Sequence, residues 1–101
     1  MKARTELQAL FEELLGSRNV YYQPPESVKM KYPAIVYSLE DFDSKNANNR
    51  PYMQSPYYQA TLIDSNPDSE FVMKILQIPY CRFARHFKSD NLNHFVFNIY
   101  N

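Results

Sequence analysis

The first apolar segment of the chain repeats with the period of a helix. Between Ala3 and Leu15 the apolar side chains recur every three or four positions, and glutamates lie between them. This spacing predicts an amphipathic helix of about three turns. Gly16 is placed to end it, since glycine is the usual residue just beyond a helix C-terminus. The expected buried face consists of Leu7, Leu10, Phe11, Leu14 and Leu15.

Segments rich in β-branched and aromatic residues predict strands. The first is short, Val20–Gln23, and ends at Pro24 and Pro25 because proline has no amide hydrogen for a sheet. The next two are Ala34–Glu40 and Tyr57–Asp64. The simplest connection makes these two strands antiparallel neighbours.

A second helix is expected after Asp64. Asn66 is a suitable N-cap, Pro67 suits the first helical position, and Asp68 lies where the helix dipole favours a negative charge. The helix is predicted to run to about Gln77 and to be closed by Pro79. Its predicted buried residues are Phe71, Val72, Ile75 and Leu76.

The last segment, Tyr80–Tyr100, predicts a hairpin. A three-residue turn at Ser89–Asn91 would pair Lys88 with Leu92. The resulting pairs are Cys81 with Ile99, Phe83 with Phe97, Arg85 with Phe95 and Phe87 with Asn93. One face is then mostly apolar, although it also contains the polar residues Arg85 and Asn93, which do not fit the pattern. The opposite, polar face would carry Arg82, His86, Lys88, His94 and Asn98.

These elements predict an α+β fold: a mostly antiparallel sheet of four to five strands with both helices packed on one face. The chain has 101 residues, a length that suits a single domain over 1–101. Between the two central strands, Asp41–Pro56 predicts a long loop or β-hairpin arm. Loops of this length in compact domains are usually either functional or disordered, so the arm is the first candidate for a partner contact.

Composition narrows the classes of function. Eleven basic and eleven acidic residues cancel, which removes the general attraction to phosphate and argues against sequence-specific nucleic-acid binding. Cys81 is the single cysteine, so an internal disulfide is excluded, and with no leader segment a reducing cytoplasm is expected. No apolar run approaches the roughly 18 residues of a membrane span, so no membrane association is expected.

Candidate chemistry is sparse. Cys81, His86 and His94 are the possible metal ligands, but the predicted register brings only the two histidines together, and two histidines make a weak site. The acidic residues Glu40, Asp41 and Asp43 cluster without a basic partner for acid–base catalysis. With a single glycine, Gly16, the chain lacks a phosphate-binding loop. We therefore expect neither an enzyme nor a cofactor.

Four segments are informative when they are taken together and in order: Val20–Pro25 (VYYQPP), Lys29–Tyr37 (KMKYPAIVY), Ile63–Ser69 (IDSNPDS) and Asp90–Phe97 (DNLNHFVF). Each segment alone is only a turn or strand signal. Together they resemble the tail-terminator, or tail-completion, proteins of tailed bacteriophages, and the resemblance covers most of the chain from Val20 onward.

This resemblance implies a structural virion protein, assembled in the host cytoplasm and located at the head-proximal end of the tail. Its subunits would form a homo-hexameric ring that caps the tail tube, ends tube polymerisation and presents the tail-side surface for head joining. The implied partners are further copies of itself, the major tail tube protein and a head-completion or connector protein, with a ring lumen available to DNA. The alternatives are a head-closure or neck connector ring protein and, with less support, a small nucleic-acid-binding module.

Two groups of residues are candidates for the subunit or tail-tube interface. In the arm they are Arg50, Tyr52 and Met53, because arginine, methionine and aromatic residues are enriched at interfaces. In the hairpin they are Arg82, His86, Lys88 and His94, a positive strip on an otherwise neutral protein. A nucleic-acid-binding module would instead bind a single strand through a basic group interleaved with two aromatic residues that stack on its bases. The basic residues are Arg82, Arg85, His86 and Lys88, and the aromatic residues are Phe83 and Phe87.

Overall fold

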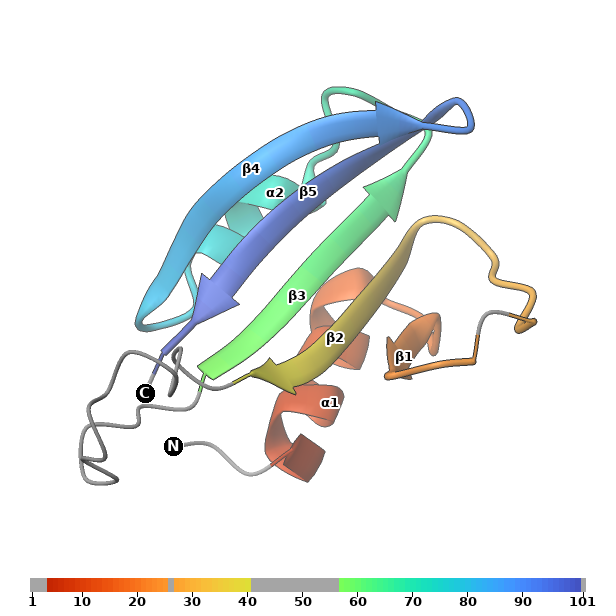
Figure 1. Ribbon diagram of the computed structural model, residues 1–101. Coiled ribbons are helices and arrows are strands. Elements are labelled where there is room, and N and C mark those ends of the chain that lie inside the picture. The colour runs from red at the N-terminus through yellow and green to blue at the C-terminus, as the bar shows by residue number, and fades with distance from the viewer. Residues whose placement is uncertain (1–3, 26, 41–56, 101) are drawn as a thin grey trace, which may run out of the picture.

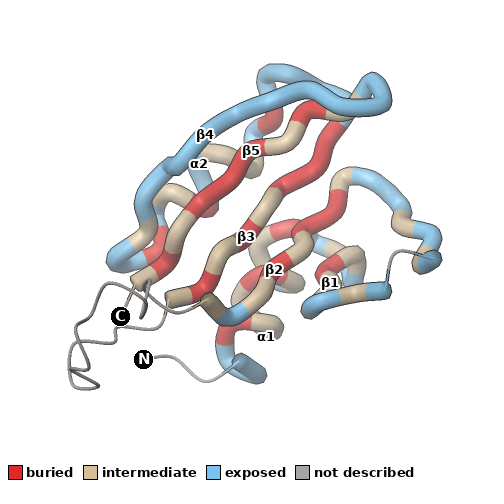
Figure 2. The backbone as a smooth tube through the Cα atoms, viewed as in Figure 1, coloured by how far each residue is buried: buried red, intermediate tan, exposed pale blue. Residues whose placement is uncertain are grey.

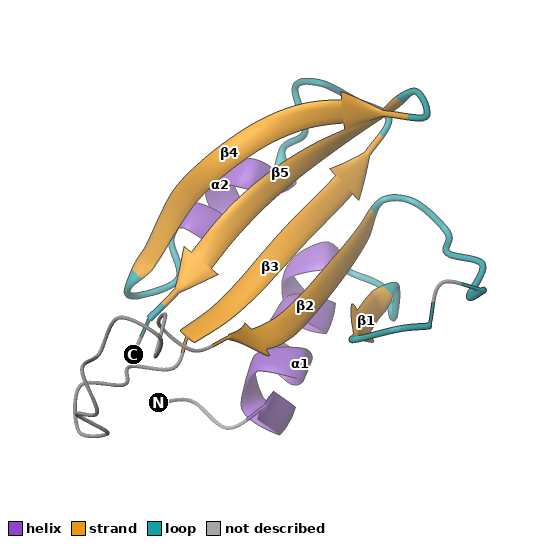
Figure 3. Ribbon diagram, in the orientation of Figure 1, coloured by secondary structure: helices purple, strands orange, loops and turns teal. Residues whose placement is uncertain are grey.

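Two helices lie against one face of a five-stranded sheet in the computed structural model of the chain (Figure 1). The structure describes residues 4–25, 27–40 and 57–100. The elements in chain order are α1 (Arg4–Leu15), β1 (Val20–Tyr22), β2 (Ala34–Glu40), β3 (Tyr57–Asp64), α2 (Phe71–Leu76), β4 (Cys81–Ser89) and β5 (Leu92–Ile99) (Figure 3). The predicted α+β class, with a mostly antiparallel sheet and both helices on one face, is confirmed.

The sheet has the strand order β1-β2-β3-β5-β4. β1 runs parallel to β2, and every other neighbouring pair is antiparallel, including the predicted pairing of β2 with β3. β1, with three residues, forms one edge, and β4, with nine residues, forms the other. The two edges therefore differ in length and in strand direction relative to their neighbours.

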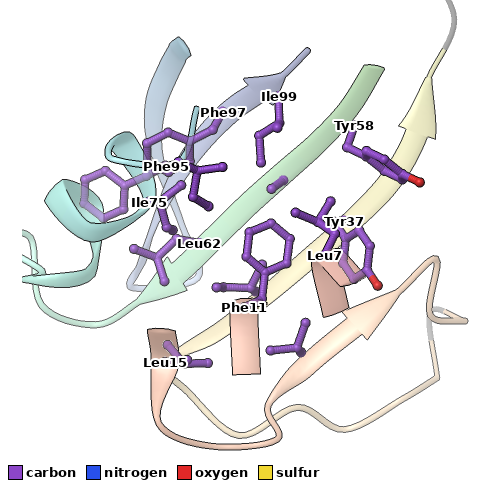
Figure 4. Packing of buried hydrophobic residues seen from close by; sticks show 14 residues of the cluster. Leu7, Phe11, Leu15, Tyr37, Tyr58, Leu62, Ile75, Phe95, Phe97 and Ile99 are labelled. Atoms are coloured by element: carbon purple, nitrogen blue, oxygen red, sulfur yellow. The ribbon is translucent and has the colours of Figure 1, made fainter. Parts of the chain in front are cut away.

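The core lies between the sheet and the helices, and Tyr37 on β2 joins several of its aromatic rings (Figure 4). The ring of Tyr37 meets the rings of Phe11 and Tyr22 edge to face, at centroid distances of 5.3 and 5.0 Å, and is tilted against that of Tyr58. Its hydroxyl donates a hydrogen bond to Gln8 Oε1. Such edge-to-face contacts add to the stabilisation that burial of the rings provides. α1 is therefore held against β2 by aromatic packing.

The N-terminal helix follows its sequence pattern closely. Leu7, Phe11 and Leu15 are buried, while Leu10 and Leu14 pack at the border of the core. Gly16 has φ +75°, and its N–H donates to the carbonyl of Glu12. The predicted glycine stop is confirmed, because this left-handed conformation costs glycine little.

The second helix begins later than the sequence predicted. The side-chain oxygen of Asn66 accepts a hydrogen bond from the N–H of Asp68 at 2.9 Å, which closes a turn before the helix instead of capping it. Ser69 then accepts from the N–H of Phe71, where α2 begins. The prediction of Asn66 as N-cap is wrong, since asparagine stabilises a local turn as readily as a helix start. Of the predicted buried residues only Ile75 is fully buried; Phe71, Val72 and Leu76 are half-buried.

The C-terminal hairpin is present, but its turn is one residue shorter than predicted. Asp90 and Asn91 both have positive φ, +54° and +64°, as a two-residue type I′ turn requires, and Ser89 pairs with Leu92. Near the turn the register is therefore shifted by one from the prediction. A β-bulge between Phe83 and Arg85 absorbs the shift. Beyond the bulge the predicted pairs, Cys81 with Ile99 and Phe83 with Phe97, are confirmed.

Candidate functional site

The free edge of the sheet is formed by β4 and is open to solvent along its length. Every residue of β4 after Cys81 is exposed (Figure 2). β5 pairs with one side of β4, and in the described part of the chain no strand pairs with the other side. The outward-facing N–H and C=O groups of β4 are thus available for a further strand. We call the outer side of β4, with its side chains, the β4 edge.

The β-bulge divides the predicted polar strip between two faces of the sheet. Arg82 lies opposite Asn98, and His94 lies opposite Phe87, on the face that carries no helix. His86 and Lys88 lie opposite Phe95 and Asn93, on the helix-covered face. The prediction that Arg82, His86, Lys88 and His94 share one face is wrong, because one bulged residue reverses the alternation of all residues beyond it.

Each histidine of the hairpin stacks on a phenylalanine of the neighbouring strand. His86 stacks on Phe95 with ring centroids 4.7 Å apart, and His94 stacks on Phe87 at the same distance. The two histidines were predicted to lie opposite one another, but they lie on different faces. Among the described residues no group of three or more metal-binding side chains is present.

The uncovered face of the hairpin carries a row of stacked side chains. The guanidinium carbon of Arg85 lies 5.7 Å from the centroid of the Phe87 ring, whose plane is within 10° of that of His94. Arg82 is exposed on the same face. The arrangement holds positive charge beside an aromatic surface, which suits an acidic or aromatic partner.

A partly buried polar contact holds the ring of His86. The ring Nε2 of His86 lies 3.0 Å from Asn93 Oδ1, and Asn93 Nδ2 donates to the carbonyl of Ser65. Asn93 is buried beside Asp64, whose carboxylate accepts from the N–H of Asn66. This network joins the hairpin to the turn that precedes α2. His86 therefore stabilises the subunit itself, in addition to any role at an interface.

Large apolar side chains are exposed along β4. Phe83 and Phe87 are 46% and 40% exposed, although each packs one surface on a neighbour, Phe97 and His94 respectively. The sequence pattern assigned both to an apolar face and predicted their burial, which counted against a stacking surface built from them and the neighbouring basic residues. The missing information is that β4 is an edge strand, which alternation along one strand does not reveal.

Cys81, the first residue of β4, packs against the core and is half-buried. Burial raises the pKa of its thiol from 9.0 to about 11. Because the folded-state pKa lies above the unfolded one, the associated stabilisation is present below pH 9 and is lost as the pH rises toward 11. The thiol is poorly suited to nucleophilic chemistry, since the thiolate is the reactive form.

Alkylation of Cys81 provides a test of this environment. At pH 8 iodoacetamide should modify the native protein about 100-fold more slowly than the chain unfolded in guanidinium, because the thiolate fraction is lower by about that factor. Mass spectrometry of timed samples gives both rates. Native and unfolded rates within about threefold of one another would contradict the raised pKa.

The acidic cluster begins at the end of β2. Glu40 is half-buried, and its carboxylate accepts a hydrogen bond from the Ser38 hydroxyl at 2.8 Å. The predicted arm, Asp41–Pro56, lies outside the described residues. So do the arm candidates for the interface, Arg50, Tyr52 and Met53.

Two further findings concern membrane spanning and similarity to known proteins. Neither α1 nor α2 is long and apolar enough to cross a membrane, and the described ranges contain no other helix that is. Comparison of the chain with protein-family models, with curated protein sequences and with solved structures finds no match.

Proposed function

We propose that this protein is a structural subunit of a bacteriophage tail. It assembles as a ring, with six subunits expected, that caps the tail tube, ends tube polymerisation and forms the tail-side surface for head joining. In this proposal its partners are copies of itself, the major tail tube protein and a head-completion or connector protein, and it catalyses no reaction. We propose a bacteriophage tail as the assembly because four sequence segments resemble those of tail-terminator proteins.

The β4 edge is the observation that supports assembly. An edge strand of nine residues with exposed Phe83 and Phe87 offers both backbone hydrogen-bonding groups and apolar surface. Proteins that remain monomeric usually shorten, cover, bend or charge such edges to prevent association. β4 is bent at one bulge and carries Arg82, Arg85 and Lys88, but it is long, and no strand in the described ranges covers it. A partner of complementary charge that meets β4 would explain why this strand is both charged and open.

The two faces of the sheet differ in a way that suits a terminating ring. α1 and α2 cover one face, and no helix in the described ranges covers the other (Figure 1). A ring stops a growing tube if one side reproduces the contacts of a tube subunit and the other side withholds them. A sheet that is covered on one side only provides two different surfaces for this purpose.

A nucleic-acid-binding module is the competing class, and one observation favours it. Arg85, Phe87 and His94 form a stacked row on the uncovered face, with Arg82 nearby in the same strand. Single-stranded nucleic acid binds to aromatic side chains flanked by positive charge. On this alternative, the substitutions Arg82→Glu and Lys88→Glu would abolish binding to a single-stranded oligonucleotide.

A head-closure or neck connector ring is the alternative among structural proteins of the virion.

The native mass of the purified protein tests the proposal. We expect a six-subunit ring, either for the protein alone or after addition of the tail tube protein encoded beside it. Native mass spectrometry or light scattering distinguishes such a ring from a monomer. A monomer that does not assemble when the tube protein is added would overturn the terminator assignment. If that monomer binds an oligonucleotide, a nucleic-acid-binding module would be favoured instead.

A further inference from the structure

We propose that the β4 edge binds an extended segment of another protein, in which acidic and apolar residues alternate. The segment would add to the sheet as a further strand beside β4. This inference deepens the proposed function, and it rests on that function for the existence of a partner protein. It adds the chemistry of the segment that the partner presents.

The β-bulge places two arginines on the same face of the β4 edge. Arg82 lies opposite Asn98 of β5. Arg85 lies opposite Val96, which is two residues away from Asn98 on β5. Alternate residues of a strand point to the same face and lie about 7 Å apart. A regular strand on the outer side of β4 would therefore meet Arg82 and Arg85 at alternate positions, although they are three residues apart in the sequence.

The two arginines have no acidic residue across the strand pair. Neither β4 nor β5 contains an acidic residue. The whole protein has no net charge, so the positive charge at this edge is local. Opposite charges at facing strand positions stabilise the pairing and increase its specificity. Acidic side chains at alternate positions of an added strand would thus be complementary to Arg82 and Arg85.

The opposite face of the edge is apolar between the two arginines. Phe83 points to the helix-covered face, where its ring packs on Phe97, and it is still 46% exposed. The residue between two acidic positions of the added strand would point to this same face. An apolar side chain there would remove the exposed part of Phe83 from water. The complementary pattern is therefore acidic, apolar, acidic.

Basic residues on an exposed edge also prevent identical edges from pairing. That role alone does not explain the apolar side chains that lie exposed beside them. The described residues include six large apolar side chains that are exposed, and Tyr80, Phe83 and Phe87 are three of them. All three lie on β4 or directly before it. Clustered apolar side chains on a surface indicate an interaction site, whereas scattered ones need no explanation.

A strand of a second copy does not supply the complementary pattern. None of the five strands in the described ranges contains two acidic residues; β2 contains only Glu40, and β3 contains only Asp64. We therefore assign the complementary segment to a different protein. The proposed function already requires partners of that kind.

Peptide binding to the full chain tests the inference. The probe is a fluorescent peptide as long as β4, nine residues, in which glutamate and valine alternate. In one control peptide lysine replaces glutamate. In a second, proline replaces valine, which keeps the charge but removes backbone N–H groups that a strand needs. Fluorescence anisotropy gives the affinities, and hydrogen exchange followed by mass spectrometry locates the peptide on the protein.

Two protein variants test the role of the arginines. One carries Arg82→Gln and Arg85→Gln. The matched control carries Arg18→Gln and Lys29→Gln, which replace exposed basic residues in the connections on either side of β1, at the opposite edge of the sheet. Circular dichroism verifies that both variants are folded. We expect the first variant to bind the glutamate–valine peptide about tenfold more weakly than the wild type, and the control to bind it unchanged.

We expect the glutamate–valine peptide to bind at least about tenfold more tightly than either control peptide and to slow hydrogen exchange in β4. Failure of this peptide to bind would show that the basic residues only protect the edge. Equal binding of the proline peptide would show attraction by charge without strand pairing. Either result would overturn the inference. If every amide of β4 already exchanges slowly before the peptide is added, a second copy occupies the edge, and the inference is overturned as well.

These measurements do not require a ring, so their failure leaves the proposed function to the test of native mass. A protein that binds the peptide at β4 but forms no ring, with or without the tube protein, would overturn the proposed function alone.

Discussion

Replacement of Phe11 by alanine should remove a substantial share of the protein's free energy of unfolding. Phe11 is completely buried in the core, and its ring packs edge to face on Tyr37 (Figure 4). Truncation of such a residue removes its apolar surface and leaves a cavity, at a cost of about 3–5 kcal/mol. Domains of this size are stable by only about 5–15 kcal/mol. Urea unfolding followed by circular dichroism measures the loss.

Glu13→Ala is the matched control for this substitution. Glu13 lies on the same helix but is exposed, so the free energy of unfolding should change by no more than about 0.5 kcal/mol. A loss of less than about 1 kcal/mol for Phe11→Ala would show that the packing of α1 against Tyr37 contributes little to stability. The assignment of the core would then be wrong in its most central contact.

The sequence predicts the central part of this fold well because its signals there are physically unambiguous. Ala34–Glu40 and Tyr57–Asp64 are β2 and β3 with the predicted bounds, since both runs are rich in residues that pack well on a pleated surface. The first helix ends where Gly16 can adopt a positive φ. In each case the local conformational preference and the burial of apolar side chains favour the same structure, so packing in the folded protein does not change the predicted element.

The turn before α2 shows why another local signal failed. The sequence Asn66-Pro67-Asp68 is as compatible with an isolated turn as with a helix start, because asparagine can accept a backbone hydrogen bond in either. The structure uses the turn, and Asp64 adds a further hydrogen bond to the N–H of Asn66. The choice depends on the buried contacts of Asp64 and Asn93, which join distant parts of the chain.

The candidate site was harder to predict than the fold, and the bulge in β4 is the cause. The predicted register placed Arg85 against Phe95, a mismatch that the sequence itself displayed. The bulge removes the mismatch by turning Arg85 to the uncovered face and placing His86 on Phe95. A pattern of alternation cannot show where an extra residue is inserted. It also cannot show that β4 is an edge strand, and this property gives Arg82, Arg85 and Lys88 their access to a partner.

Deletion of Asn46–Gln54 should produce a folded protein that no longer forms rings. The deleted residues include Arg50, Tyr52 and Met53, the predicted anchors of the arm. Glu40 and Tyr57 are paired at the adjoining ends of β2 and β3, and the remaining linking residues are enough to close a hairpin between them. The core contacts of the sheet are unchanged by the deletion, so folding should persist. Buried aromatic and arginine anchors carry most of the binding energy of an interface, so assembly should be lost.

A second variant separates the length of the arm from the chemistry of its side chains. It keeps the arm at full length but carries Arg50→Ala, Tyr52→Ala and Met53→Ala, and it should lose rings as the deletion does. Both variants leave the residues of the helices and strands unchanged, so ring loss in them reports on the arm. Native mass gives the oligomeric state, and the urea midpoint verifies folding. An intact ring in the deletion variant would show that the arm is dispensable, and subunit contact would then depend on the β4 edge and the surfaces that surround it.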